Sequence, residues 1–110
     1  MIESYDFGHI VIDGKEYTSD VILDKGSVSE WWRKTSHNVE PADIEQVATK
    51  KPELIIFGNG FSGNMAVPDE TVKWLEEKGI KIVVQITKDA VATYNSSKVE
   101  NKIGCFHLTC

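Results

Sequence analysis

A glycine-rich segment follows a short apolar run in the middle of the chain. Residues 54–57 read Leu-Ile-Ile-Phe and residues 58–63 read Gly-Asn-Gly-Phe-Ser-Gly, which fits the pattern G-x-G-x-x-G. Glycines at the end of a strand leave backbone N–H groups uncovered, and such groups bind phosphates and other anions. The candidate ligand-binding residues in this segment are Gly58, Asn59, Gly60 and Gly63.

A dinucleotide cofactor needs more than these glycines. In a dinucleotide fold a helix starts within the glycines and an acidic residue ends the second strand. Here residues 64–67 separate the last glycine from Pro68, and the next predicted strand runs into Thr87 with no acid before Asp89. We therefore expect no NAD and no other cofactor. Two interpretations of the loop remain: a site for a small anion, or a turn in which glycine lets the backbone leave the sheet sharply.

A histidine and two cysteines lie close to the C-terminal end of the sequence. On a strand, Cys105 and His107 share one face and Cys110 lies on the other, so at most two of them reach one ion. Structural zinc needs four ligands, and we therefore expect no metal site. At about 16 Å apart along a strand, the two cysteines are also too distant for a disulfide, which fits a reducing compartment.

Two interpretations of His107 also remain. It is a hydrogen-bonded histidine near the end of the sheet, or it lines a pocket at the glycine loop and acts there as a donor or base. The loop of residues 58–67 is longer than the usual two to six residues, which favours a cleft. The further candidate ligand-binding residues at this cleft are Thr87, Tyr94 and His107.

A second cluster combines aromatic and basic residues in an irregular stretch of the sequence. Trp31 and Trp32 are adjacent, so on an extended chain they face opposite ways and one of them is open to solvent. Aromatic residues and arginine are enriched at the centres of protein interfaces, although one tryptophan can equally pack in the core. The candidate interface residues are Trp31, Trp32, Arg33 and His37.

The bulk composition limits the classes of protein that fit. At 110 residues the chain has room for one domain, residues 1–110. The net charge of −5 argues against a nucleic-acid partner, because proteins that bind the phosphate backbone concentrate lysine and arginine. The sequence shows no basic and apolar leader and no apolar run of membrane-spanning length. We therefore expect a soluble cytoplasmic protein with a protein partner or a homo-oligomeric state, and with no membrane partner.

Strands fill the first third of the sequence, and helices alternate with strands after it. The pair Asp13-Gly14 between apolar runs predicts a two-residue hairpin turn. The apolar runs 54–57 and 80–86 flank a helical pattern and predict a right-handed βαβ unit with parallel strands. Strands are expected at 9–12, 15–17, 20–23, 54–57, 80–86 and 103–108, helices from 41, over 68–78 and from an N-cap at Thr87 to Asn95, and residues 28–38 are ambiguous.

Short segments in a fixed order carry a family resemblance. They are Tyr5-Asp6-Phe7-Gly8, Tyr17 to Asp20, Gly58-Asn59-Gly60, Gly79-Ile80, Thr87 with Ala90 and Tyr94-Asn95, and Phe106-His107-Leu108-Thr109-Cys110. Together they resemble the small α/β domain-of-unknown-function family that includes the human adipogenesis-associated domain protein and mitochondrial complex I assembly factor 3. The resemblance implies a three-layer α/β fold with a mixed central sheet whose last strand is antiparallel to its neighbours. It implies no established catalysis and no obligatory cofactor.

These observations lead to two hypotheses of function. The first is a non-catalytic binding or assembly domain that acts as a scaffold, because no nucleophile–base pair or metal cluster stands out. The alternative is a small-molecule enzyme or sensor that binds an anion in the glycine-loop pocket.

Overall fold

The computed structural model describes residues 1–110 and contains two β-sheets and three helices. The smaller sheet is antiparallel, in the order β1-β2-β3, and the larger one has the order β5-β4-β8-β6-β7. The strands are β1 (Ile2–Asp6), β2 (His9–Ile12), β3 (Lys15–Tyr17), β4 (Val21–Asp24), β5 (Ser27–Glu30), β6 (Leu54–Asn59), β7 (Lys81–Gln85) and β8 (Lys102–His107). The helices are α1 (Pro41–Ala48), α2 (Asp69–Glu76) and α3 (Thr87–Ser96).

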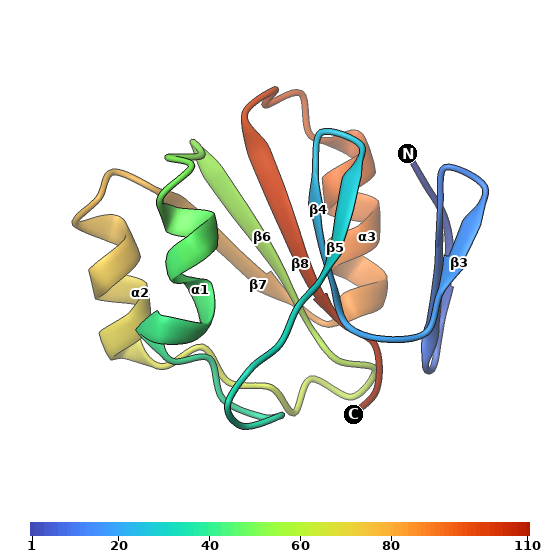
Figure 1. Cartoon of the computed structure of the whole chain (residues 1–110), viewed down its shortest axis with the longest axis horizontal. Coiled ribbons are helices and arrows are strands. Elements are labelled where there is room, and N and C mark those ends of the chain that lie inside the picture. The colour runs from blue at the N-terminus through green and yellow to red at the C-terminus, as the bar shows by residue number, and fades with distance from the viewer.

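The larger sheet is the middle of three layers. Helices α1 and α2 cover one face, and α3 with the smaller sheet covers the other (Figure 1). Successive side chains of a strand point to opposite faces, so Ile55 and Cys105 join the core under α1 and α2. Ile56 and Phe106 join the core under α3 and the smaller sheet. The predicted three-layer α/β fold with a mixed sheet is therefore confirmed.

Two tight turns organise the N-terminal strands. Asp13 and Gly14 have φ angles of 49° and 82°, and Ile12 pairs with Lys15 across them, as a two-residue hairpin requires. Lys25 and Gly26 make the same kind of turn between β4 and β5, with φ angles of 50° and 89°. The N-terminal hairpin predicted from the sequence is confirmed.

The predicted βαβ unit is also confirmed, but the place of the last strand is different from the expectation. Strands β6 and β7 are parallel and are joined by α2. Strand β8 is parallel to β6 and antiparallel only to β4, so the expectation of a last strand antiparallel to its neighbours is wrong. The reason is that α3 carries the chain from β7 across the sheet, and such a crossover brings the next strand back in the same direction.

The structure defines residues 28–38, which the sequence left ambiguous, and the start of α3. Strand β5 ends at Glu30, and residues 31–40 run without regular structure to α1. The N-cap of α3 is Ile86, not Thr87, because the Thr87 hydroxyl is engaged elsewhere. The longest of the three helices has 10 residues, and none is long and apolar enough to cross a bilayer.

Candidate functional site

The glycine loop lies at the carboxyl ends of the parallel strands, and most of its amides donate to the chain itself. The amides of Phe61 and Asn64 donate to the main-chain oxygens of Thr109 and Cys110, at 2.8 and 3.0 Å. The amide of Gly60 donates to the Thr87 hydroxyl at 2.9 Å. Two further amides bond to main-chain oxygens, Met65 to Asn59 and Ala66 to His37. The segment Thr109–Cys110 therefore occupies the place in which we expected an anion.

Two glycines explain how the chain packs so closely here. A Cβ on Gly60, whose φ is +110°, would lie 2.4 Å from the carbonyl carbon of Cys110. A Cβ on Gly58 would lie 2.9 Å from the hydroxyl oxygen of Thr87. Real Cβ atoms do not approach other atoms this closely, so any other residue would have to displace main-chain atoms at Gly60 and the Thr87 side chain at Gly58. In Gly63, φ is +77° and the neighbouring contacts are looser.

Thr87 joins three segments that are distant in the sequence. Its hydroxyl donates to the main-chain oxygen of His107 at 2.6 Å and accepts the amide hydrogen of Gly60. The side chain is fully buried. Thr87, Gly60 and His107 are therefore brought together by hydrogen bonds within the protein.

The side chain of His107 belongs to a buried polar cluster with Asp20 and Arg33. His107 Nδ1 lies 2.7 Å from Asp20 Oδ2, and Arg33 Nη2 lies 2.7 Å from the same oxygen. Asp20 Oδ1 accepts the amide hydrogen of Leu108 at 2.8 Å. The guanidinium also donates to the Ser36 carbonyl and stacks 4.4 Å from the centre of the Trp31 ring. We call Asp20, Arg33 and His107 the polar triad.

One carboxylate, that of Asp20, is shared by the other two members of the polar triad. Burial alone would raise the pKa of Asp20, but hydrogen bonds from His107, the Leu108 amide and Arg33 outweigh it and hold that pKa below its usual value. Asp20 is therefore ionised at neutral pH and balances the guanidinium. Because an ionised carboxylate can only accept, His107 Nδ1 donates its hydrogen to Asp20, and the other ring nitrogen is Nε2. That atom is buried without a partner, and so are Arg33 Nε and Nη1.

The four candidate interface residues are divided between the core and the surface. Trp31 is 3% exposed, and its indole N–H donates to the main-chain oxygen of Asp43 at 3.1 Å. Trp32 is 73% exposed. Arg33 is buried in the polar triad, and the exposed ring of His37 stands edge-on to His107 at 6.0 Å between centroids.

A shallow hollow of about 290 Å³ lies next to Trp32. We call it the Trp32 hollow. Its lining residues are Ser19, Asp20, Glu30, Trp31, Trp32, Arg33 and Ser36. One wall is thus the exposed indole, and another is formed by members of the polar triad.

Tyr94 lies apart from the other candidate site residues. Its ring packs edge-on against Phe106 at 6.0 Å between centroids, in the core under α3. His107 follows Phe106 on β8 and therefore points to the opposite face of the sheet. The structure consequently does not bring Tyr94 and the His107 side chain into one pocket.

The chemistry open to this arrangement is limited. His107 Nε2 makes no hydrogen bond, and its burial keeps it from a substrate. Burial raises the pKa of the Cys105 thiol, because the apolar surroundings disfavour the thiolate, and this weakens it as a nucleophile. No group of three or more His, Cys, Asp and Glu side chains is placed to hold a metal ion. Both cysteines are free thiols, with Cys105 buried and Cys110 exposed.

Asp20 belongs to no chemical motif that can be recognised in the sequence. It lies 87 positions before His107 and 13 before Arg33, so no short motif joins the three. Two signals were present in the sequence. A carboxylate directly precedes the apolar strand Val21–Leu23, where an unpaired charge is costly, and Asp20 ends one of the segments that carry the family resemblance.

The family of the chain follows from comparison with known proteins. A family described as "Protein of unknown function (DUF498/DUF598)" matches residues 2–106. This protein belongs to that family. The match confirms the coarser part of the resemblance, a domain family of unknown function with an α/β fold.

Solved structures share the whole fold. The conserved hypothetical protein PH1505 from Pyrococcus horikoshii OT3 is 24% identical, with a TM-score of 0.89 over 100% of this chain and 99% of that chain. The protein MT938 is 26% identical, with a TM-score of 0.83 over 100% and 98% of the two chains. A Bordetella pertussis protein described as a Mth938-like domain is 16% identical, with a TM-score of 0.78 over 97% and 84%.

Proposed function

We propose that this protein is a non-catalytic binding domain that acts as a scaffold in the assembly of a protein complex, with Trp32 at the centre of its partner surface. The observation that carries the proposal is an indole that is 73% exposed between two buried neighbours. Trp32 is the most exposed aromatic side chain of the protein, and its indole offers a partner both a large apolar surface and an N–H donor. Tryptophan and arginine are enriched among residues that dominate binding energy.

The residues on either side fix the position of Trp32. Trp31 is anchored by its hydrogen bond to Asp43 and by its packing on Phe57, with 6.0 Å between ring centroids. Arg33 is anchored by Asp20 and by the Ser36 carbonyl. Because the backbone is held at both neighbours, less conformational freedom is lost when a partner binds the indole.

The Trp32 hollow gives the partner a place for one side chain. It lies between the indole and Glu30, whose carboxylate accepts a hydrogen bond from the Ser19 hydroxyl. Its volume of about 290 Å³ is small for a metabolite and suits a protruding side chain. The resemblance to mitochondrial complex I assembly factor 3 adds support to an assembly role.

The alternative function, an anion-binding enzyme or sensor at the glycine loop, has less support. Only the amides of Ser62 and Gly63 remain without an acceptor between residues 60 and 66. Asn59 Oδ1 is buried without a partner near Gly63, but it is an acceptor and would repel an anion. The geometry therefore favours the binding domain.

The test compares two exposed aromatic residues. Tagged wild-type protein, Trp32→Ala and Phe61→Ala are used to isolate partners from cells of the source organism. The main purified partner is then titrated against each variant by calorimetry. We expect Trp32→Ala to raise the Kd at least about 30-fold, as for a hot-spot residue, and Phe61→Ala, which is 50% exposed, to leave it within about three-fold. An unchanged Kd for Trp32→Ala would remove Trp32 from the partner surface.

A further inference from the structure

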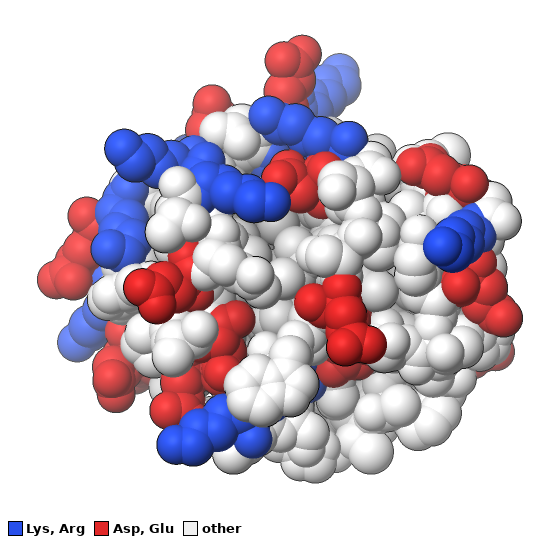
Figure 2. All heavy atoms as spheres, viewed as in Figure 1, with Lys and Arg blue, Asp and Glu red and all other residues white.

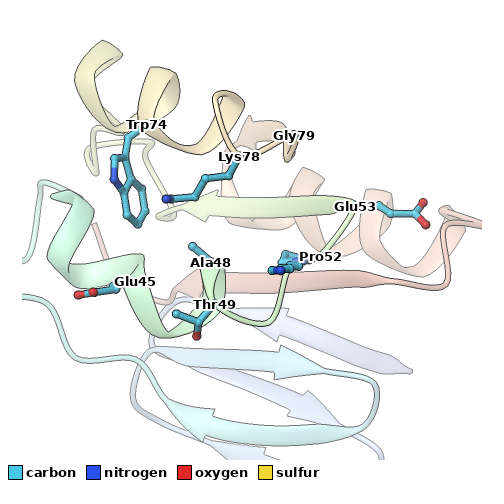
Figure 3. A pocket seen from close by; sticks show the side chains of 9 residues that line it. Glu45, Ala48, Thr49, Pro52, Glu53, Trp74, Lys78 and Gly79 are labelled. Carbon is cyan, nitrogen blue, oxygen red and sulfur yellow. The ribbon is translucent and has the colours of Figure 1, made fainter.

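A second and larger hollow lies at the other end of the sheet, where no candidate residue was expected. Its volume is about 680 Å³, within the range of small-molecule sites. The C-terminal ends of α1 and α2 form its sides, and Pro52 and Gly79, which precede β6 and β7, close it (Figure 3). We call it the helix-end hollow.

The apolar part of this hollow has the surfaces needed to bind a planar chemical group. The Trp74 side chain hangs from α2 over α1, and Ala48 and Pro52 lie below it (Figure 3). Ala48 and Pro52 are buried, whereas Trp74 is only half-buried. The protein therefore leaves part of an indole surface uncovered beside a space of ligand size.

The charged part of the hollow is a cation without a carboxylate partner. Lys78 extends from the end of α2 toward Trp74, and its Nζ lies 4.4 Å from the centre of the ring (Figure 3). None of the five ion pairs in the protein involves Lys78 or Lys51, the second lysine of the lining. Glu45 and Glu53 also border the hollow, but their carboxylates point away from its centre (Figure 3).

The charge of this region contrasts with that of the whole molecule. The protein carries a net charge of −5, yet basic side chains gather over the ends of α1 and α2 (Figure 2). Cations at helix C-termini complement the helix dipole, and this accounts for lysines there. It does not account for a hollow of this size or for an indole left open to it.

We propose that the helix-end hollow binds a small aromatic carboxylate. The ring of the ligand stacks on Trp74 above Ala48 and Pro52, and its carboxylate accepts a hydrogen bond from Lys78. Lys51 adds a second positive charge at the rim. This site is separate from the Trp32 surface, and neither depends on the other.

The experiment titrates the uniformly ¹⁵N-labelled protein with three small probes, followed by NMR. Benzoate has the ring and the negative charge, acetate has only the charge, and benzylamine has the ring with a positive charge. We expect benzoate to bind with a millimolar Kd and to shift the Trp74 indole signal, assigned with Trp74→Phe, together with amides of residues 48–53 and 78–80. Acetate and benzylamine should bind at least about ten-fold more weakly.

Two lysine variants make the test specific. Lys78→Gln should weaken benzoate at least about five-fold, and its unchanged spectrum elsewhere will show that it is folded. Lys50→Gln is the matched control, because Lys50 lies beside the hollow but pairs with Asp24 at 3.2 Å. Tighter binding of benzylamine than of benzoate, equal Kd values for the two lysine variants, or no saturable shift with benzoate would overturn the proposal.

Discussion

The two ends of the parallel strands differ in what fills them. At the carboxyl ends, most amides of the glycine loop and the carboxylate of Asp20 are satisfied by other parts of the same chain. At the amino ends, the helix-end hollow leaves Trp74 half-uncovered and Lys78 without a carboxylate. Ligands of open α/β sheets usually bind at the carboxyl ends of the strands. In this protein that end is closed by its own residues, and the space of ligand size is at the opposite end.

The difference shows that a glycine-rich loop after a strand is not by itself a ligand site. Glycine permits close approach of backbone to backbone as well as of backbone to phosphate. Which of the two occurs depends on whether another segment of the same chain packs against the loop. Here Thr109–Cys110 does so.

The largest expected effect on the free energy of unfolding is at the closed end of the sheet, where the carboxyl ends of the parallel strands lie. Asp20→Asn removes the only charge that balances the buried Arg33, so we expect a loss of about 3–5 kcal/mol in the free energy of unfolding, measured with urea. Asp24→Asn is the control, because its partner Lys50 is exposed and the pair is worth about 1 kcal/mol or less. Equal losses in the two variants would show that the polar triad does not hold this end together.

The glycine loop gives the next largest effect. Gly60→Ala should cost about 2–3 kcal/mol, because the residue has a positive φ and its new Cβ would meet Cys110. Gly8→Ala is the control, because Gly8 also has a positive φ, of +81°, but nothing lies within 4 Å of the new Cβ. A difference of less than about 0.5 kcal/mol between the two, measured by urea unfolding, would mean that Thr109–Cys110 does not pack against the loop.

Acid should weaken the closed end selectively. The folded state holds the pKa of Asp20 below its ordinary value of 3.8. A lowered carboxyl pKa contributes stability that is present above the unfolded pKa and is lost as the pH falls through the folded one. We therefore expect the free energy of unfolding to fall below about pH 4, and this part of the fall to be absent in Asp20→Asn. Identical slopes for both proteins between pH 4 and pH 2 would contradict the assignment.

The smallest effect on the free energy of unfolding is expected at the open end of the sheet, where the helix-end hollow lies. Lys78→Gln removes a cation–π contact at an exposed side chain and should cost only about 0.5 kcal/mol. Urea unfolding measures this directly, with Lys50→Gln as the comparison. A loss above about 2 kcal/mol would show that Lys78 has a structural role and that the two ends of the sheet are equally closed.

The sequence by itself determined the elements whose cause is local. Asp13-Gly14 predicted a hairpin because positive φ angles suit those residue types, and the structure has it. The apolar runs around α2 predicted parallel strands because a short helix between buried strands must cross the sheet. The alternating direction of side chains along the last strand correctly placed Cys105 on one face of the sheet and Phe106 on the other.

Only the tertiary structure decided which distant residues meet. Strand β8 lies between β4 and β6, and this pairing carries His107 to Asp20 and Arg33. The same pairing places Phe106 and Tyr94 together on the other face, away from the glycine loop. Periodicity reports the direction of a side chain relative to its own strand, but the order of strands depends on the packing of the whole chain. The sequence pointed to single residues of the polar triad and of the Trp32 hollow, but their assembly depends on that order, and no pattern in the sequence revealed the helix-end hollow.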